Sequence, residues 1–227
     1  MGRSSEDSDG DAMARHLTAL TLAALAVRVA FLLCEPATHP VGDERTWTDW
    51  ALNLSSDRVQ FSPLRIHLIF YPPIYPYFLA VLYKATGGFQ AARWAQAVLG
   101  ALVVPAVGLA GARAFSTRVG VLAAAVVAFY PELVWFAVHF WSETVFMLFL
   151  WWGFERLLAA DADTGRGLGR AVAAGALFGL AILTRETVLY FVPLAALWLG
   201  TGARERARLC AVSFLAAALL VVAPWTY

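Results

Sequence analysis

The sequence is poor in charged residues and in cysteine, and it contains none of the common short catalytic motifs. Charged residues make up 15% of the 227 residues, and hydrophobic residues make up 60%. Soluble domains, by comparison, are about 25% charged and about 45–50% apolar. Two cysteines make no disulfide framework, and HExxH, CxxC, GxSxG and P-loop patterns are missing. These absences exclude a soluble domain, a disulfide-stabilised secreted domain, a paired-histidine zinc site and a phosphate-binding loop.

Basic residues are present, but they form no nucleic-acid signature. Lys84 is the single lysine among 17 basic residues, and the formal net charge is +1. No basic stripe with interleaved aromatic residues occurs along the chain. We therefore expect no nucleic-acid partner, and the positions of the charges carry more information than their sum.

Long apolar runs predict an all-α polytopic membrane protein with about seven spans. The runs cover residues 17–34, 91–112, 119–139, 144–160, 171–183, 188–200 and 210–224. Gly175, Gly179 and many alanines within them are typical of close helix packing in a bilayer. Residues 1–16 are polar and acidic, which predicts a disordered cytoplasmic tail ahead of a transmembrane domain over residues 17–227. The first run lacks a cleavage signal and is expected to remain as an anchor.

Residues 35–90 contain too many charges and prolines to form one span. Within them, residues 71–87 fit either a span or an interfacial amphipathic helix. The arginines favour the second interpretation, because it places every later arginine cluster inside if the N-terminus is inside. Those clusters are Arg113 and Arg118; Arg156, Arg166 and Arg170; and Arg204, Arg206 and Arg208. Residues 35–90 then form a long first outer loop.

This orientation gathers acidic and basic residues at the outer face. They are Asp43, Glu44, Lys84, Glu132, His139, Glu143, Arg185 and Glu186. Charges that converge on one side of a helical bundle at the lipid boundary indicate a functional site.

Each of these residues also has a purely structural interpretation. Asp43 and Glu44 are either a general base with a carboxylate that holds an acceptor hydroxyl or a metal, or two solvated loop acids. Glu143 either favours the positive N-terminus of its helix or faces a reaction centre. Arg185 either pairs with Glu186 or grips a phosphate, for which a guanidinium is well shaped. Lys84 is a second cation for that phosphate, or it extends to the lipid headgroups.

Arg28 and His139 are expected to have structural roles. Arg28 lies inside the first apolar run, where a charge costs about 2.5–3.5 kcal/mol on insertion scales. We expect its side chain to extend to the interface or to pair with Glu35. His139 is expected to be an interface residue rather than a metal ligand.

The order of motifs resembles the GT-C membrane glycosyltransferases, in the bacterial branch akin to protein O-mannosyltransferases and aminoarabinose transferases. The motifs are Gly42-Asp43-Glu44, Tyr71-Pro72-Pro73-Ile74-Tyr75-Pro76, Leu82-Tyr83-Lys84, Ala92-Arg93, Pro131-Glu132, Ser142-Glu143-Thr144, Leu183-Thr184-Arg185 and Pro224-Trp225-Thr226. The resemblance covers nearly the whole chain from about residue 17. Relatives are usually far longer, so we expect this chain to be the N-terminal portion of such an enzyme.

The resemblance implies an inverting transfer of a sugar from a polyprenyl-phosphate donor to a hydroxyl of a lipid, protein or polysaccharide. The expected place is the non-cytoplasmic face of a bacterial inner membrane. Asp43 would be the base, with Glu44 and Glu143 as further catalytic residues. Lys84, Arg185, Tyr71 and Glu186 would bind substrate. A divalent metal is left open, because some relatives bind one and others do not.

The competing interpretation is a non-catalytic membrane subunit, a transporter of lipid-linked saccharides or an inactive fragment. A transporter is expected to carry polar residues through the bilayer midplane and often an internal repeat. Here the charges cluster at one face instead, which favours the enzyme.

Overall fold

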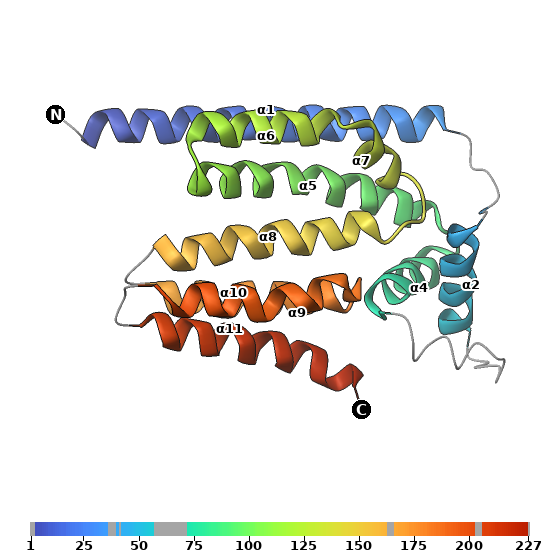
Figure 1. Ribbon diagram of the computed structural model, residues 1–227. Helices are drawn as coiled ribbons and strands as arrows, with labels where there is room; N and C mark the ends of the chain where they lie inside the picture. The colour runs from blue at the N-terminus through green and yellow to red at the C-terminus, as the bar shows by residue number, and fades with distance from the viewer. Residues whose placement is uncertain are drawn as a thin grey trace.

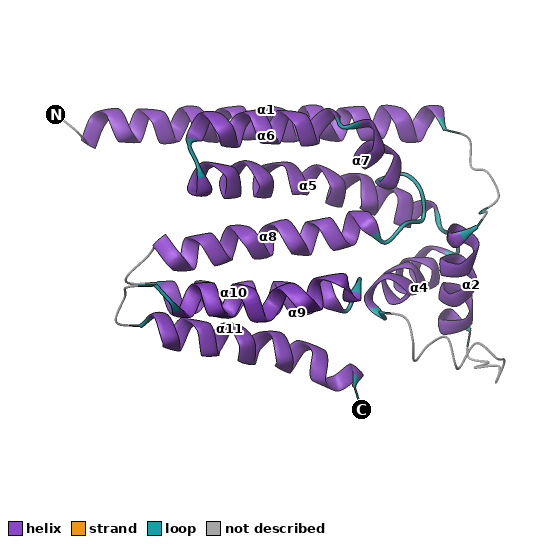
Figure 2. Ribbon diagram, viewed as in Figure 1, coloured by secondary structure: helices purple, strands orange, loops and turns teal. Residues whose placement is uncertain are grey.

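The structure, a computed structural model, describes residues 3–35, 40, 42–56, 72–162, 166–202 and 206–226. Over these residues it consists of helices and their connections, with no strand (Figure 2). The α-helices are α1 (Arg3–Cys34), α2 (Asp43–Ser55), α4 (Ile74–Thr86), α5 (Gln90–Ala114), α6 (Thr117–Phe129), α7 (Pro131–Phe136), α8 (Glu143–Ala162), α9 (Gly167–Ile182), α10 (Phe191–Gly200) and α11 (Ala207–Val222). Two short 3₁₀ helices are η1 (Glu186–Tyr190) and η2 (Ala223–Trp225).

The longer apolar helices form a bundle, and two amphipathic helices lie across one end of it. Helices α1, α5, α6, α8, α9, α10 and α11 run along a common direction, whereas α2 and α4 lie at the end where α1 finishes (Figure 1). Helix α5 packs against α1, α6 and α8, and α9 packs against α8 and α11. The predicted all-α membrane bundle is thereby confirmed.

The number of membrane crossings stays a prediction. Within the described residues, Gly10–Cys34, Gln90–Ala114 and Ala207–Trp225 are long and apolar enough to cross a membrane. Thr117–Phe129, Gly167–Ile182 and Glu186–Gly200 are apolar but shorter.

Two helix boundaries differ from those expected from hydropathy. Helix α1 already begins at Arg3, so residues 3–16 continue the first span as helix where an unstructured tail is expected. Adding residues to an existing helix costs little, and this stretch contains no proline. The expected span over residues 119–139 is broken into α6 and α7 at Tyr130, which is extended before Pro131. A residue that precedes proline is biased away from helical backbone angles.

Small residues allow the bundle helices to approach closely, as the sequence predicts. A Cβ atom at Gly175 would lie 2.1 Å from the carbonyl oxygen of Phe214, so α9 and α11 are in backbone contact there. A Cβ atom at Gly120 would lie 2.3 Å from the carbonyl oxygen of Gly108, where α6 meets α5. The ring of Phe178 fills the adjacent core against Phe154, Phe191 and Phe214.

Arg28 faces the bundle interior, which corrects the expectation that it extends to the interface or pairs with Glu35. Its side chain is only 1% exposed. Its Nη1 donates to the carbonyl oxygens of Ala128 (3.0 Å) and Ala24 (3.1 Å), and Nη2 donates to that of Val127 (3.4 Å). Ala128 and Val127 lie in the last turn of α6, where carbonyls lack helical partners and attract a cation. The guanidinium therefore caps α6.

A second buried charge cluster joins α5 and α8 at the opposite end of the bundle. Glu155 is 1% exposed and forms ion pairs with Arg113 of α5 and with its neighbour Arg156, whose Nε lies 2.7 Å from Glu155 Oε2. Two arginines therefore compensate one buried carboxylate, which an acid inside an apolar bundle requires.

We expect Gly175→Ala to destabilise the bundle, because the new methyl group would meet backbone atoms of α11 that have no room to shift. Overpacking of this kind costs about 1–3 kcal/mol. Gly169→Ala is the matched control on α9, since nothing lies within 4 Å of a Cβ atom there. Thermal unfolding in detergent should show a lower midpoint for Gly175→Ala and an unchanged or higher midpoint for Gly169→Ala. Equal midpoints would contradict the close contact of α9 and α11.

Candidate active site

A polar cavity lies where α2 and α4 meet the end of the bundle. Its volume is about 190 Å³. The lining residues are Asp43, Trp47, Pro72, Trp141, Ser142, Glu143, Thr184, Arg185, Glu186 and Thr187. Four residues that the sequence predicts as site residues, Asp43, Glu143, Arg185 and Glu186, therefore come together from three separate segments.

Each segment brings its residue to the cavity at the end of a helix. Asp43 is the first residue of α2, which follows Gly42 in a backbone conformation (φ 57°, ψ −129°) that suits glycine. Glu143 is the first residue of α8. Arg185 is extended between α9 and η1. Helix starts and unwound backbone thus expose these side chains at the bundle end rather than within it.

Arg185 and Glu143 form an ion pair across the cavity. Arg185 Nη1 lies 2.5 Å from Glu143 Oε1 and 3.3 Å from the hydroxyl oxygen of Ser142. Arg185 therefore pairs with Glu143 of α8 rather than with its neighbour Glu186. The two contacts use one guanidinium nitrogen, and Nη2 and Nε make no hydrogen bond to any described residue. These two nitrogens remain available to an anionic ligand.

Asp43 and Glu44 face different surroundings, although they are adjacent in the chain. Successive residues of an α-helix point about 100° apart. Asp43 is exposed and lines the polar cavity without a hydrogen bond to a described residue. Glu44 is 8% exposed, and its Oε1 accepts a hydrogen bond from the backbone N–H of Phe140 at 2.9 Å. Asp43 is thus free to act on a ligand, whereas Glu44 is engaged by the protein.

Glu44 borders a second cavity of about 310 Å³, which residues of the 136–140 turn also line. Arg93 and His139 also line it. Arg93 is 7% exposed, and its Nε donates to the carbonyl oxygen of Val138 at 3.0 Å. His139 stacks on Trp135 at 4.2 Å between ring centroids, and its Nε2 lies 3.8 Å from Glu35 Oε1. The interface role expected for His139 stays a prediction.

The buried polar residues Tyr75 and Gln96 lie next to the site without lining either cavity, and sequence reasoning assigned them no role. Both are 0% exposed, and the hydroxyl of Tyr75 donates to Gln96 Oε1 at 2.8 Å. Gln96 Nε2 donates to the carbonyl oxygens of His139 (2.6 Å) and Phe136 (3.2 Å). An amide within an otherwise apolar helix was the available signal, because polar groups inside membrane segments usually have partners.

Burial raises the pKa of the Tyr75 hydroxyl well above its usual value, and the nearby carboxylates of Glu143 and Glu44 raise it further. Both causes disfavour the phenolate, the first by desolvation and the second by charge repulsion. Tyr75 therefore stays protonated and keeps its hydrogen bond to Gln96 at neutral pH.

Two of the predicted substrate-binding residues are not brought to the cavity. Lys84 is exposed in the last turn of α4, whereas the cavity borders the first end of that helix at Pro72. The ten helical steps from Ile74 to Lys84 correspond to about 15 Å. Tyr71 lies outside the described residues. The functional roles of both residues stay predictions.

The described carboxylates do not form a ready metal site. Among the described residues, no group of three or more His, Cys, Asp or Glu side chains could hold a metal ion together. Glu44 is engaged by the Phe140 N–H and Glu143 by Arg185. A divalent cation needs several free oxygen ligands, and these two carboxylates already have partners within the protein.

The fold and cavity define a class, a helical membrane protein with acids and an arginine gathered at one end of its bundle. Residues 71–227 match the model of the family described as dolichyl-phosphate-mannose-protein mannosyltransferase. The chain belongs to this family, which makes it a GT-C membrane glycosyltransferase of the mannosyltransferase-like kind and confirms the resemblance drawn from its motifs. Comparison with curated proteins and with solved structures gives no match. The matched range includes Glu143 and Arg185 but begins after Asp43 and Glu44.

We expect Tyr75 to remain un-ionised in the folded protein at about pH 11, where a tyrosine of ordinary pKa near 10 is ionised. Ultraviolet absorbance at 295 nm, which reports tyrosinate, should therefore be equal for the folded wild type and Tyr75→Phe. After unfolding, the wild type should show one tyrosinate more than the variant. A difference of one tyrosinate between the folded proteins would contradict the burial of Tyr75.

Proposed function

We propose that this protein transfers a sugar from a polyprenyl-phosphate donor to a hydroxyl acceptor at the non-cytoplasmic face of a bacterial inner membrane. The observation that carries this proposal is the polar cavity itself. It combines Asp43, a carboxylate that has no hydrogen-bond partner among the described residues, with Arg185, whose Nη2 and Nε also have none there. A base and a phosphate-binding cation are the two groups that this reaction needs.

In the proposed reaction, Asp43 accepts the proton of the acceptor hydroxyl as its oxygen attacks the anomeric carbon of the donor sugar. A new bond forms between the anomeric carbon and the acceptor oxygen. The bond between that carbon and the phosphate oxygen breaks, and its electron pair leaves with the polyprenyl phosphate. Attack on the side opposite the phosphate inverts the anomeric configuration.

Arg185 is proposed to bind the donor phosphate and to stabilise the charge that develops on it. Its guanidinium can bind two phosphate oxygens at once through Nη2 and Nε. Glu143 holds the remaining nitrogen, which fixes the direction of the guanidinium plane. Glu143 is thus proposed to orient Arg185, and Glu186 to border the bound substrate.

The proposed membrane orientation follows from the arginines at the other end of the bundle. Arg113, Arg118, Arg156, Arg166 and Arg170 lie in or beside the helix ends opposite the cavity. Basic residues in short connections favour the cytoplasmic side. This supports a cavity that opens on the outer side.

We expect Asp43→Asn to lower sugar transfer by about 100-fold or more, because general-base catalysis contributes about 10²–10⁴-fold. Asp49→Asn is the matched control, since Asp49 lies on the same helix, is exposed and pairs with Arg45 away from the cavity. The measurement is transfer from a radiolabelled polyprenyl-phosphate sugar in membranes that contain the full chain. Full activity of Asp43→Asn would reject Asp43 as the base. Absence of transfer by the wild type would favour a non-catalytic subunit.

We expect Arg185→Gln to raise the KM for the donor by about 10-fold or more, because hydrogen bonds to charged groups contribute about 1.5–3 kcal/mol. Arg45→Gln is the control, as Arg45 is an exposed arginine at the same end of the molecule. Initial rates are measured over a range of donor concentrations. An unchanged KM would show that Arg185 does not bind the donor phosphate.

A further inference from the structure

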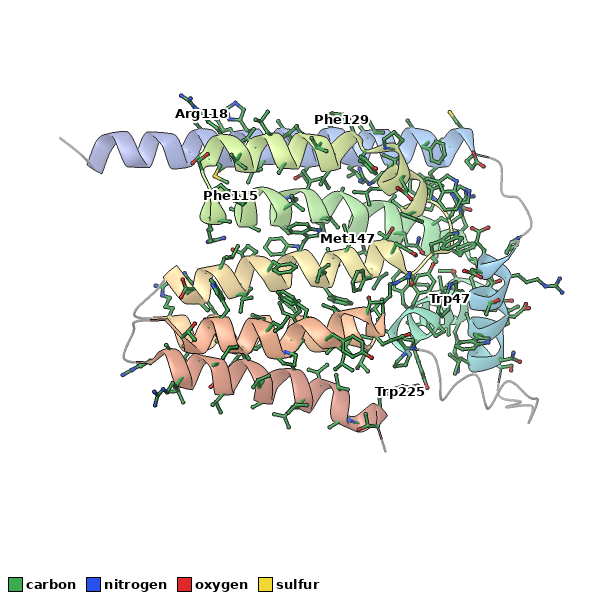
Figure 3. The ribbon with its side chains drawn as sticks, in the orientation of Figure 1. Trp47, Phe115, Arg118, Phe129, Met147 and Trp225 are labelled. Atoms are coloured by element: carbon green, nitrogen blue, oxygen red, sulfur yellow. The ribbon has the colours of Figure 1, made fainter. Side chains whose placement is uncertain are left out.

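A closed set of contacts surrounds the start of α2. From Glu44 it leads to the N–H of Phe140, from the residue 136–140 turn to Gln96 on α5, and from Gln96 to Tyr75 on α4. From Tyr75 it returns to α2 through Trp47, whose ring meets that of Tyr75 edge to face at 5.4 Å. We call this set the α2 ring. Trp47 lies between α2 and α4 (Figure 3), one helical turn from Asp43.

Gln96 is the member of the α2 ring that joins three elements at once. Its Nε2 contacts two carbonyl oxygens, which accept hydrogen bonds only, so the amide orientation is determined by its partners. Its Oε1 then accepts from the Tyr75 hydroxyl. Both amide hydrogens and one acceptor position are used, and no water is needed to satisfy this fully buried side chain.

We infer that Gln96, supported by Tyr75, is a positioning residue that holds Asp43 in its catalytic orientation. The argument rests on the proposed function, in which Asp43 acts as the base. Gln96 touches no substrate, because it does not line the polar cavity. Gln96 holds the turn that carries the N–H of Phe140. This N–H donates to Glu44, and the bond prevents the first turn of α2 from rotating. Asp43 lies in that turn and therefore keeps its orientation.

The donor-binding part of the cavity is held by contacts that do not include Gln96. Arg185 is fixed by Glu143 and Ser142, and the N–H of Ile74 donates to the carbonyl oxygen of Leu183 near the end of α9 at 3.0 Å. Loss of Gln96 should therefore disturb the base without disturbing the phosphate site. This predicts a fall in kcat with little change in the donor KM.

The test uses Gln96→Met, which keeps the length of the side chain and removes its hydrogen bonds, and the milder Tyr75→Phe. We expect kcat to fall by about 10–100-fold for Gln96→Met, because small misplacements of a catalytic group cost up to about 10²-fold. Tyr75→Phe should lower kcat by about 5-fold, the equivalent of one hydrogen bond of about 1 kcal/mol. Tyr83→Phe is the matched control on α4, since its hydroxyl has no hydrogen bond to a described residue and its ring packs on Phe89.

A conservative variant separates positioning from general loss of stability. In Gln96→Glu, the introduced carboxyl can donate a hydrogen bond to the turn only when it is protonated. Its activity relative to the wild type should therefore rise as the pH is lowered from 8 to 6. A ratio that stays constant with pH would contradict the inference.

A measurement independent of activity tests the geometry. Spin labels at position 45 on α2 and position 118 on α6, in a chain with Cys34 and Cys210 replaced by alanine, report the place of α2 relative to the bundle. We expect a narrow distance distribution in the wild type and in Tyr83→Phe, and a broader one in Gln96→Met and Tyr75→Phe. Unchanged distributions in both variants would overturn the inference, even if the wild type transfers no sugar and the proposed function fails. Broad distributions with unchanged kcat would also overturn it, while leaving the proposed function intact.

Discussion

The arrangement of the cavity end depends on the hydrogen bonding of one short stretch, residues 136–140, which begins at the last residue of α7 and is no longer helical before α8. Backbone that leaves the helix near a membrane needs internal partners, because lipid supplies none. Gln96 and Arg93 of α5 donate to three of its carbonyl oxygens, and Glu44 of α2 accepts from the N–H of Phe140. Since these partners come from two other helices, satisfying the stretch also attaches α2 to the bundle.

The polar cavity consequently lies between two parts that are held by different side-chain contacts. On one side, the attachment of α2 brings Asp43 to the cavity. On the other side, the Arg185–Glu143 pair joins the start of α8 to the connection after α9. Because Asp43 and Arg185 are held by different helices, Asp43 can be oriented toward the acceptor and Arg185 toward the donor. This arrangement suits a reaction between two substrates.

The family match and the geometry of the cavity support the proposed function through different residues. The family match covers residues 71–227 and therefore the arginine side of the cavity. Asp43 precedes this range, and its proposed role depends on the motif resemblance and on its position in the cavity. Buried charges away from the cavity have a different purpose. Arg28 caps α6, and Glu155 joins α5 to α8, so neither is free for chemistry.

The sequence by itself determined the helical membrane class, the close packing at Gly175 and the likeness to GT-C enzymes. Apolar runs and small residues act locally, and each can be interpreted without knowing the neighbours. It also predicted that Asp43, Glu143, Arg185 and Glu186 lie at one end, because alternating spans bring every second connection to the same side. The break between α6 and α7 was within reach of the sequence through Pro131, but the apolar run concealed it.

Only the tertiary structure decided which of these side chains face one another. Asp43 and Glu44 separate into two cavities because α2 packs across the bundle end with one fixed rotation. Arg28 donates to carbonyl oxygens of α6, and Arg185 pairs with Glu143 instead of Glu186. In both cases helix packing brings a residue that is distant in the chain to the guanidinium. Gln96 acquires its role from the turn packed against it. Hydrogen bonds and ion pairs act over a few ångströms, so their partners are set by helix packing that no local pattern encodes.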